Sequence, residues 1–326
     1  MFFTGGTISM RFDPALGGAV PALSPGDILG MTGDLAALAQ IETHDVARLP
    51  GPHMTPARML DMAHRIAEVL RQPGITGAVV THGTDTLEET ACLVDLVLGS
   101  GKPVVFTGAM RSSSDLSWDG PANLRAALRV AADPACQGLG SVVVWNDRIL
   151  AAADVTKTHT ESVDTFQERD LGCLGLVDRD RILMQRRQPV RPPFSCERLE
   201  EAVEVVKLSA GSDGRMVGAA IGLGARGLVI EGLGRGNVPI TALPEVLKAI
   251  DSGIPVVITS RCPRGRVLDT YAYEGAGRGL RQRGAILGGL LPGHKARIRL
   301  MLLIGAGKDR EAIRTSFEEC PANSSG

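Results

Sequence analysis

A histidine, three threonines and three carboxylates lie within nine residues, His82–Thr90. The apolar run 77–81 before them predicts a buried strand, and apolar residues at helical spacing over 87–99 predict a helix. Thr84 and Asp85 therefore lie at a strand-to-helix turn, beside the free amides and the positive dipole end of the helix. A turn needs only one or two capping oxygens. The remaining polar groups indicate a site that binds or transforms a ligand.

Two further stretches carry groups that could complete a hydroxyl-based catalyst. Thr7 follows a glycine turn, Gly5–Gly6, at the end of a short first strand. Lys157 follows an alanine-rich apolar run, and a partly buried lysine can lose its proton and act as a base. A hydroxyl nucleophile needs such a base because an alcohol attacks weakly at neutral pH. Taken alone, Thr7 and Thr84 are more often turn or capping residues than nucleophiles.

These stretches together resemble the signatures of the bacterial-type L-asparaginase family. Its Thr-Gly-Gly-Thr-Ile signature is present at 4–8, and its His-Gly-Thr-Asp-Thr-x-Glu-Glu-Thr signature is intact at 82–90. Shorter matches follow at 107–111, 119–124, 154–158, 232–237, 260–265 and 295–297. The resemblance spans nearly the whole chain, with two long signatures in the expected order.

The resemblance implies a reaction and a role for each matching residue. Thr7 would attack the side-chain amide of L-asparagine and form an acyl-enzyme ester, which water then hydrolyses to L-aspartate after ammonia has left. Thr84, Lys157 and Asp85 would assist proton transfer, and Asp85 and Thr84 would bind substrate, Asp85 through the α-ammonium. Residues 88–90 would cap the helix and support the turn without touching substrate. No metal or organic cofactor is implied.

The resemblance also implies assembly. Family members usually form homotetramers, dimers of dimers, in which the large domain of one subunit and the small domain of a neighbour share each site. Asn237 matches a position that the neighbour contributes, although a turn residue after glycine is an equally good interpretation. Apart from copies of itself, the expected partner is a small amino-acid amide.

A tyrosine that the family commonly places in the loop after the first threonine is missing. Residues 8–30 contain none, and the chain has only two tyrosines, Tyr271 and Tyr273. Either of these, near Glu274, could reach the site from the small domain. Packing at a subunit interface is the competing interpretation.

A second departure concerns the substrate's α-carboxylate. The family usually contacts this group with a serine, whereas this chain has Gly51-Pro52-His53 at the corresponding place. The Gly51 amide or the His53 imidazole would therefore take that role, and substrate affinity or specificity would differ from that of typical members.

Strand-like and helical runs alternate along the chain, which predicts an α/β fold. Strands are expected at 77–81, 103–107, 141–145, 217–221, 227–230, 255–259 and 285–287. Helices are expected at 56–70, 87–99, 121–132 and from about 292. The segment 11–25, rich in proline and glycine, is predicted to be a mobile loop.

This pattern predicts two domains. A larger N-terminal catalytic α/β domain, 1–188, would contain a mostly parallel sheet flanked by helices. A basic, proline-rich stretch begins a predicted linker, 189–213, and a smaller C-terminal α/β domain would follow at 214–326. Parallel sheets bind ligands at the carboxyl ends of their strands, where Thr7 and Thr84 both fall.

The composition narrows the class of protein further. The 326 residues carry a formal net charge of −1, which argues against a nucleic-acid-binding surface. No apolar run is long enough to span a bilayer and no signal segment precedes the first motif, so we expect no membrane association and a cytoplasmic location. The six cysteines and six histidines lack metal-site spacing, which predicts reduced thiols and no metal. Because the first strand is very short, we expect the natural chain to begin upstream.

Three alternatives to an L-asparaginase follow from the residues. The pattern Gly222-x-Gly224-x-x-Gly227 matches a dinucleotide fingerprint, but it precedes a predicted strand instead of following one, so its context fails. An amidohydrolase of the same fold could act on L-glutamine, D-asparagine or another small amide. A non-catalytic amino-acid-binding relative is the third alternative, and the missing loop tyrosine favours it.

Overall fold

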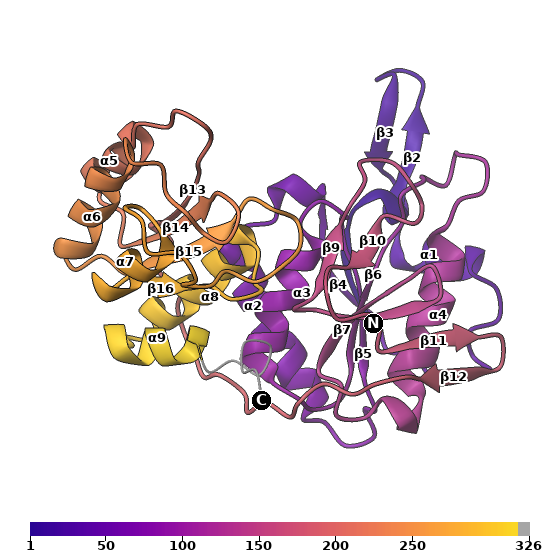
Figure 1. The fold of residues 1–326 in the computed structure, drawn as a ribbon. Coiled ribbons are helices and arrows are strands. Elements are labelled where there is room, and N and C mark those ends of the chain that lie inside the picture. The colour runs from indigo at the N-terminus through magenta and orange to yellow at the C-terminus, as the bar shows by residue number, and fades with distance from the viewer. Residues whose placement is uncertain (319–326) are drawn as a thin grey trace. The chain divides into compact units, whose positions relative to one another are not determined.

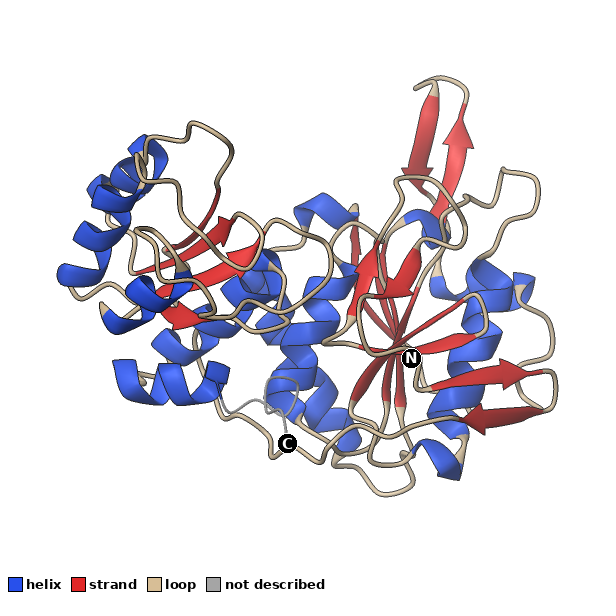
Figure 2. Ribbon diagram, viewed as in Figure 1, coloured by secondary structure: helices blue, strands red, loops and turns tan. Residues whose placement is uncertain are grey.

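The computed structural model describes residues 1–318 and divides the chain into two compact units. The first unit is Met1–Phe194, and the second begins at Ser195. Figure 1 follows the chain through both units, and Figure 2 shows that each unit contains strands and helices. The predicted two-domain α/β class is confirmed.

An eight-stranded sheet, in the order β12-β11-β8-β7-β6-β5-β1-β4, forms the centre of the first unit. From β4 to β7 neighbouring strands run parallel, whereas β8, β11 and β12 extend the sheet with antiparallel pairs. Four of the parallel strands, β1, β5, β6 and β7, are buried at every residue, as expected of a sheet covered on both faces. The bounds are β1 Phe2–Gly5, β4 His44–Leu49, β5 Ala78–Thr81, β6 Val104–Thr107, β7 Ser141–Trp145, β8 Arg148–Ala151, β11 Gly175–Asp178 and β12 Arg181–Met184.

Helices cover the two faces of this sheet. Helix α4 (Gly120–Ala132) packs on β5, β6 and β7 on one side, and α3 (Leu87–Leu98) packs on β6 and β7 on the other (Figure 1). Helix α2 (Pro56–Leu70) lies outside α3, so α3 is enclosed between a helix and the sheet and is apolar around most of its circumference. Shorter elements are α1 (Pro25–Met31) and the 3₁₀ turns η1 (Thr7–Ser9), η2 (Gly51–His53) and η3 (Pro134–Cys136).

The second unit contains a four-stranded parallel sheet in the order β13-β14-β15-β16. Helix α8 packs against β13, β14 and β15, while α5 and α6 pack against each other. The strands are β13 Val203–Lys207, β14 Gly227–Gly232, β15 Val256–Ser260 and β16 Ile286–Leu287. The helices are α5 Arg215–Gly222, α6 Leu243–Asp251, α7 Gly277–Gln282, α8 Gly293–Gly305 and α9 Arg310–Glu318.

One predicted strand, 217–221, is wrong, because these residues belong to helix α5. A short apolar run cannot be assigned to a strand or a helix by its pattern alone. The buried residues of the helix, Val217 and Ala220, are three apart and therefore share one helical face. Gly214, in the left-handed conformation, precedes the first turn.

The prediction of a mobile loop over 11–25 is also wrong. Strands β2 (Met10–Asp13) and β3 (Gly18–Pro21) form an antiparallel hairpin there, and α1 begins at Pro25. The Asp13 carboxylate accepts a hydrogen bond from the backbone N–H of Ala15 at 2.8 Å, and Gly17 closes the turn with a φ of 64°. The proline and glycine residues here belong to a hairpin and its turn. Composition alone does not distinguish such a hairpin from an irregular loop.

The segment expected to form a linker, 189–213, is divided between the two units. Residues up to Phe194 belong to the first unit, and β13 within this segment is the edge strand of the second sheet. Residues 319–326 of the domain predicted at 214–326 lie outside the described residues.

Five cysteines of residues 1–318 lie outside any disulfide: Cys92, Cys136, Cys173, Cys196 and Cys262. Burial raises the pKa of the Cys136 thiol to about 11. In the same residues no helix is both long enough and apolar enough to cross a bilayer.

A buried ion pair ties the end of the first unit to α3. Asp95 is 2% exposed; its Oδ2 lies 2.5 Å from Nη2 of Arg191, and its Oδ1 accepts a hydrogen bond from the Ser141 backbone N–H at 3.1 Å. The backbone of Arg191 also exchanges hydrogen bonds with Ser100. The segment that leads out of the first unit is thus fixed to the sheet and to α3 by one carboxylate.

We expect Asp95→Ala to lower the free energy of unfolding by about 2–4 kcal/mol, because it leaves the Arg191 guanidinium, whose side chain is only 20% exposed, without its carboxylate partner. Chemical denaturation measures this loss. Replacing both partners, in Asp95→Leu with Arg191→Met, should recover most of it, because no uncompensated charge remains. A loss below about 1 kcal/mol in the single variant, the value of an exposed ion pair, would contradict this assignment.

Candidate active site

Three adjacent parallel strands bring the predicted site residues of the first unit to one edge of the sheet. Strand β1 lies between β5 and β4, so the segments that follow the three strands leave the sheet side by side. Thr7 begins η1 after β1, Gly51 begins η2 after β4, and Thr84 follows β5. The sequence predicted this edge for Thr7 and Thr84, and the topology places Gly51 and His53 there as well.

Glycines let the three segments touch. A Cβ atom on Gly6 would lie 2.4 Å from Cα of Gly83, and one on Gly83 would lie 2.6 Å from Cα of Gly51. Gly6 also has a φ of 80°, which favours glycine. Because the backbones of Gly6 and Gly83 are in contact, the residues that follow them, Thr7 and Thr84, start from neighbouring points.

Lys157 joins Thr84 and Asp85 in a single cluster. Its Nζ donates hydrogen bonds to Thr84 Oγ1 at 2.9 Å and to Asp85 Oδ1 at 2.7 Å. The lysine side chain is 16% exposed, whereas that of Asp85 is 54% exposed. The cluster thus has a shielded end at the lysine and an open carboxylate that a cationic ligand group could reach.

The strand that carries Lys157 is held by a residue that the sequence assigned to helix capping. Lys157 lies in β9 (Val155–Lys157), which forms a two-stranded sheet with β10 (Phe166–Glu168). Oε1 of Glu88, in the first turn of α3, accepts hydrogen bonds from the Lys157 N–H at 3.0 Å and from Thr156 Oγ1 at 3.2 Å. The Glu88 side chain is buried to 7% exposure, and a buried carboxylate needs hydrogen-bond partners.

The expected side-chain cap of α3 is absent from the structure. Thr86 occupies the N-cap position without a capping hydrogen bond, and its hydroxyl donates instead to the Gly51 carbonyl at 2.8 Å. This bond fixes the segment after β4 to the turn before α3. Gly51 is buried and packs against Asp85, whereas His53 is exposed. The polar residues of 82–90 therefore stabilise contacts between segments more than they cap the helix.

His82 is a buried structural histidine. Its Nδ1 lies 2.8 Å from the Gly83 carbonyl oxygen and its Nε2 lies 3.0 Å from Thr90 Oγ1. A carbonyl can only accept, so Nδ1 carries the proton. Nε2 and the Thr86 carbonyl, at 3.1 Å, are then the two acceptors for the single Thr90 hydroxyl proton. Burial lowers the pKa of His82 to about 4, so the ring is neutral at physiological pH. It holds the Gly83 peptide from which Thr84 projects.

Two other family motifs also organise loops at this edge. The Asp119 carboxylate accepts hydrogen bonds from the backbone N–H groups of Met110 and Arg111. The Asn123 side chain donates to the Gly108 carbonyl at 3.1 Å and accepts from the Asn146 N–H at 3.2 Å. These motifs tie the segment after β6 to α4 and to the turn after β7.

The second unit holds the other residues singled out in the sequence. Asn237 lies in a tight turn after β14, paired with Leu233, and its Oδ1 has no hydrogen-bond partner among the described residues. Tyr271 and Tyr273 lie on the segment between β15 and α7 with ring centroids 5.7 Å apart, and both are exposed, as is Glu274. Their participation in a site with Thr7 stays a prediction.

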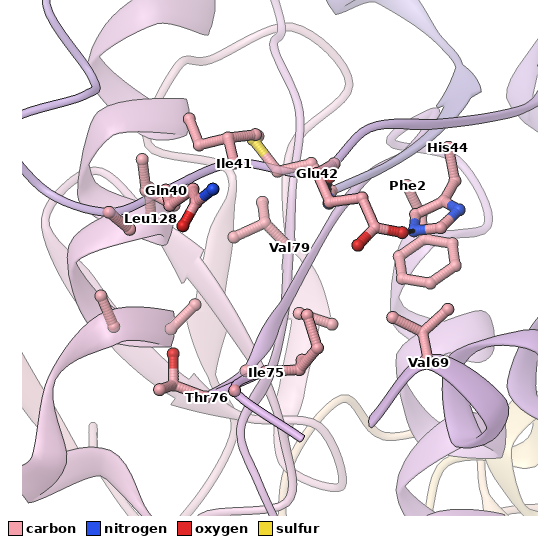
Figure 3. A pocket seen from close by; sticks show the side chains of 17 residues that line it. Phe2, Gln40, Ile41, Glu42, His44, Val69, Ile75, Thr76, Val79 and Leu128 are labelled. Atoms are coloured by element: carbon pink, nitrogen blue, oxygen red, sulfur yellow. Dashed lines mark hydrogen bonds and ion pairs between the residues drawn. The ribbon is translucent and has the colours of Figure 1, made fainter. Parts of the chain in front are cut away.

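A separate pocket lies at the opposite ends of the same strands (Figure 3). Phe2, His44 and Val79 line it from the sheet, and Nε2 of His44 lies 3.0 Å from Oε1 of Glu42. None of the predicted site residues contributes to its lining. Within residues 1–318, no group of three or more His, Cys, Asp or Glu side chains is arranged to hold a metal ion.

The fold and the cluster define a two-domain α/β protein with a threonine, a lysine and an aspartate joined at the carboxyl ends of a parallel sheet. Comparison with known families agrees with this description. The model of the asparaginase N-terminal family matches residues 1–190, and that of the glutaminase/asparaginase C-terminal domain matches residues 202–317. The chain therefore belongs to the asparaginase family.

Relatives of similar length support the same assignment. The chain is 41% identical to a probable L-asparaginase of Deinococcus radiodurans, over 98% of this chain and 96% of that protein. It is 36% identical to an L-asparaginase of Bacillus licheniformis, over 96% and 97% of the two chains. The structure of a probable cytoplasmic L-asparaginase from Campylobacter jejuni matches with a TM-score of 0.85 and 30% identity, covering 97% of each chain.

The buried neutral His82 should make stability fall in mild acid. Its folded-state pKa of about 4 lies below the usual value of 6.5, so between these values only the unfolded chain binds the extra proton. Stability is full above pH 6.5 and declines toward pH 4, by about 2 kcal/mol between pH 7 and pH 5 from this group. Denaturation of wild type and His82→Gln at both pH values measures the contribution.

The His82→Gln variant should lose the part of the pH dependence of stability that comes from His82. The His53→Gln variant, which changes an exposed histidine, should retain it. Equal pH dependence in wild type and His82→Gln would show that His82 does not titrate as described.

Proposed function

We propose that the protein is an amidohydrolase that converts L-asparagine to L-aspartate and ammonia through an acyl-enzyme on Thr7. The observation that carries this proposal is the cluster in which Lys157 Nζ bonds both Thr84 and Asp85, beside the glycine contact that brings the Thr7 segment to the same place. The names of the similar proteins, L-asparaginases from several bacteria, support the same substrate.

The reaction assigns a separate task to each hydroxyl. The Thr7 oxygen attacks the carbon of the side-chain amide, and its proton is transferred to the nitrogen that leaves as ammonia. Water then attacks the ester, its hydroxyl joins the acyl group, and a proton returns to Thr7. Thr84 is the group through which Lys157 exchanges a proton with the reacting atoms, since Nζ already contacts the Thr84 hydroxyl at 2.9 Å.

Asp85 contacts the lysine and is also our candidate for binding the substrate. In the free protein its carboxylate accepts a hydrogen bond from Lys157 Nζ. A substrate α-ammonium bound to Asp85 would compete for that carboxylate and add positive charge near Nζ. The Gly51 amide and the exposed His53 are our candidates for the substrate α-carboxylate.

The remaining expectations are part of the same proposal. If sites are shared within a homotetramer, a neighbouring subunit would contribute Asn237 and one or more of Tyr271, Tyr273 and Glu274. The Asn237 Oδ1 atom, which has no hydrogen-bond partner among the described residues, supports such a role for Asn237. The structural relative from Campylobacter jejuni is named as cytoplasmic, which favours the cytoplasm. A relative from Haemophilus influenzae is named as periplasmic, so fractionation of cells is the test of location.

Ammonia release tests the chemistry. We expect wild type to release ammonia from L-asparagine faster than from L-glutamine, D-asparagine or a β-aspartyl amide. Thr7→Ala should abolish turnover, because the nucleophile is gone, and Lys157→Met should reduce kcat by about 10²–10⁴-fold, because the base is gone. Unchanged circular dichroism would show that both variants fold.

Other outcomes select the alternatives. Faster hydrolysis of L-glutamine or D-asparagine would make the protein an amidohydrolase of different specificity. Binding of these amino acids without ammonia release would identify a non-catalytic relative. Full activity in Thr7→Ala would exclude Thr7 as the nucleophile.

The role of the two tyrosines has its own test. If a phenol hydroxyl from the second unit replaces the missing loop tyrosine, Tyr271→Phe or Tyr273→Phe should lower kcat by about 10²-fold or more with little change in folding. Full turnover in both variants would leave the tyrosines with a packing role only.

A further inference from the structure

The carboxylate of Glu88 connects two parts of the candidate site. Thr84 and Asp85 belong to the turn that leads into α3, whereas Lys157 belongs to β9, which lies outside the eight-stranded sheet. Glu88 lies in the first turn of α3, and its Oε1 accepts both hydrogen bonds from β9. The bonding distances are 3.0 Å to the Lys157 nitrogen and 3.2 Å to Thr156 Oγ1.

The register of the β9–β10 ribbon explains why Lys157 needs this acceptor. Thr158 N–H bonds the Thr165 carbonyl and Arg169 N–H bonds the Asp154 carbonyl, which makes these hydrogen-bonded pairs. Bonded and non-bonded pairs alternate in an antiparallel ladder, so Lys157, opposite Phe166, falls in a non-bonded pair. Its N–H therefore points away from β10, and Glu88 supplies the partner.

We infer that Glu88 is a positioning residue that keeps Nζ of Lys157 within hydrogen-bonding distance of Thr84 and Asp85. The inference rests on the proposed function for its catalytic consequence, but the anchor itself is a contact between α3 and β9. Thr84 and Asp85 lie in the turn that leads directly into α3. If β9 moves relative to α3, Nζ of Lys157 therefore moves relative to both Thr84 and Asp85.

The acceptor atom, and not the negative charge, carries this role. Both donors bond the same oxygen, Oε1, so a glutamine at position 88 can present a carbonyl oxygen to both of them. The carboxylate of Glu88 is buried to 7% exposure. Its burial in the first turn of α3 is tolerated because the positive end of the helix dipole stabilises an anion there.

The test compares Glu88→Ala with Glu88→Gln in the full chain, using L-asparagine as the substrate. Glu88→Ala should lower kcat by about 100-fold with a much smaller change in KM, because Nζ is displaced while Asp85 remains. Glu88→Gln should keep kcat within about tenfold of wild type, because the acceptor survives. The matched control is Glu89→Ala, in the same helical turn, which should retain wild-type kcat.

Hydrogen exchange gives a readout that does not depend on turnover. The amides of residues 155–157 should exchange faster in Glu88→Ala than in wild type, and at the wild-type rate in Glu88→Gln. If Glu88→Ala fails to fold, Thr156→Val removes one of the two bonds from the other side, and its β9 amides should also exchange faster than those of wild type.

Several results would overturn the inference. Wild-type kcat in Glu88→Ala would do so, as would a loss of kcat without faster exchange in β9. A loss in Glu88→Gln as large as that in Glu88→Ala would show that the charge matters instead of the acceptor. If wild type hydrolyses no amide, the proposed function fails, yet faster exchange in Glu88→Ala would still support the anchor.

Discussion

Three chain segments meet at the carboxyl ends of β1, β4 and β5, and at two of their contacts only glycine fits. A Cβ atom on Gly6 would lie 2.4 Å from Cα of Gly83, and one on Gly83 would lie 2.6 Å from Cα of Gly51. Several polar groups of the candidate site follow or contact these glycines. Thr7 follows Gly6, Thr84 follows Gly83, and Thr86 bonds the Gly51 carbonyl. Side chains at these positions would separate the segments and the groups they carry.

Outside this contact the site depends on buried polar groups that have both partners in place. His82 bonds the Gly83 carbonyl and the Thr90 hydroxyl, while Glu88 bonds β9. Burying each group costs desolvation free energy, and its hydrogen bonds compensate this cost. The same hydrogen bonds fix the position of a neighbouring peptide. The solvent-accessible group is Asp85, with a side chain 54% exposed. The site thus combines a rigid support with one open charge for a ligand.

Local sequence patterns predicted the elements that are long or strongly apolar. Helix 56–70 and the buried strands around 77–81, 103–107 and 141–145 agree with α2, β5, β6 and β7. The ribbon of β9 and β10 was missed because three-residue strands show no period. The pairing of Lys157 with Thr84 was expected only from the family resemblance, since the residues are 73 apart in sequence. The role of Glu88 could not be read locally, because its partners lie in that same distant segment.

The separation between Lys157 and Thr84 also has a consequence for how the first unit folds. The turn before α3 is assembled from nearby strands, but the lysine arrives only when a loop of 73 residues has closed. Closing such a loop costs entropy before any contact is gained, so this docking belongs among the later events of folding. In a state that contains β1, β5 and α3 without docked β9, Asp85 would be in place and Lys157 would not. Docking of β9 is therefore the step that completes the cluster of Thr84, Asp85 and Lys157.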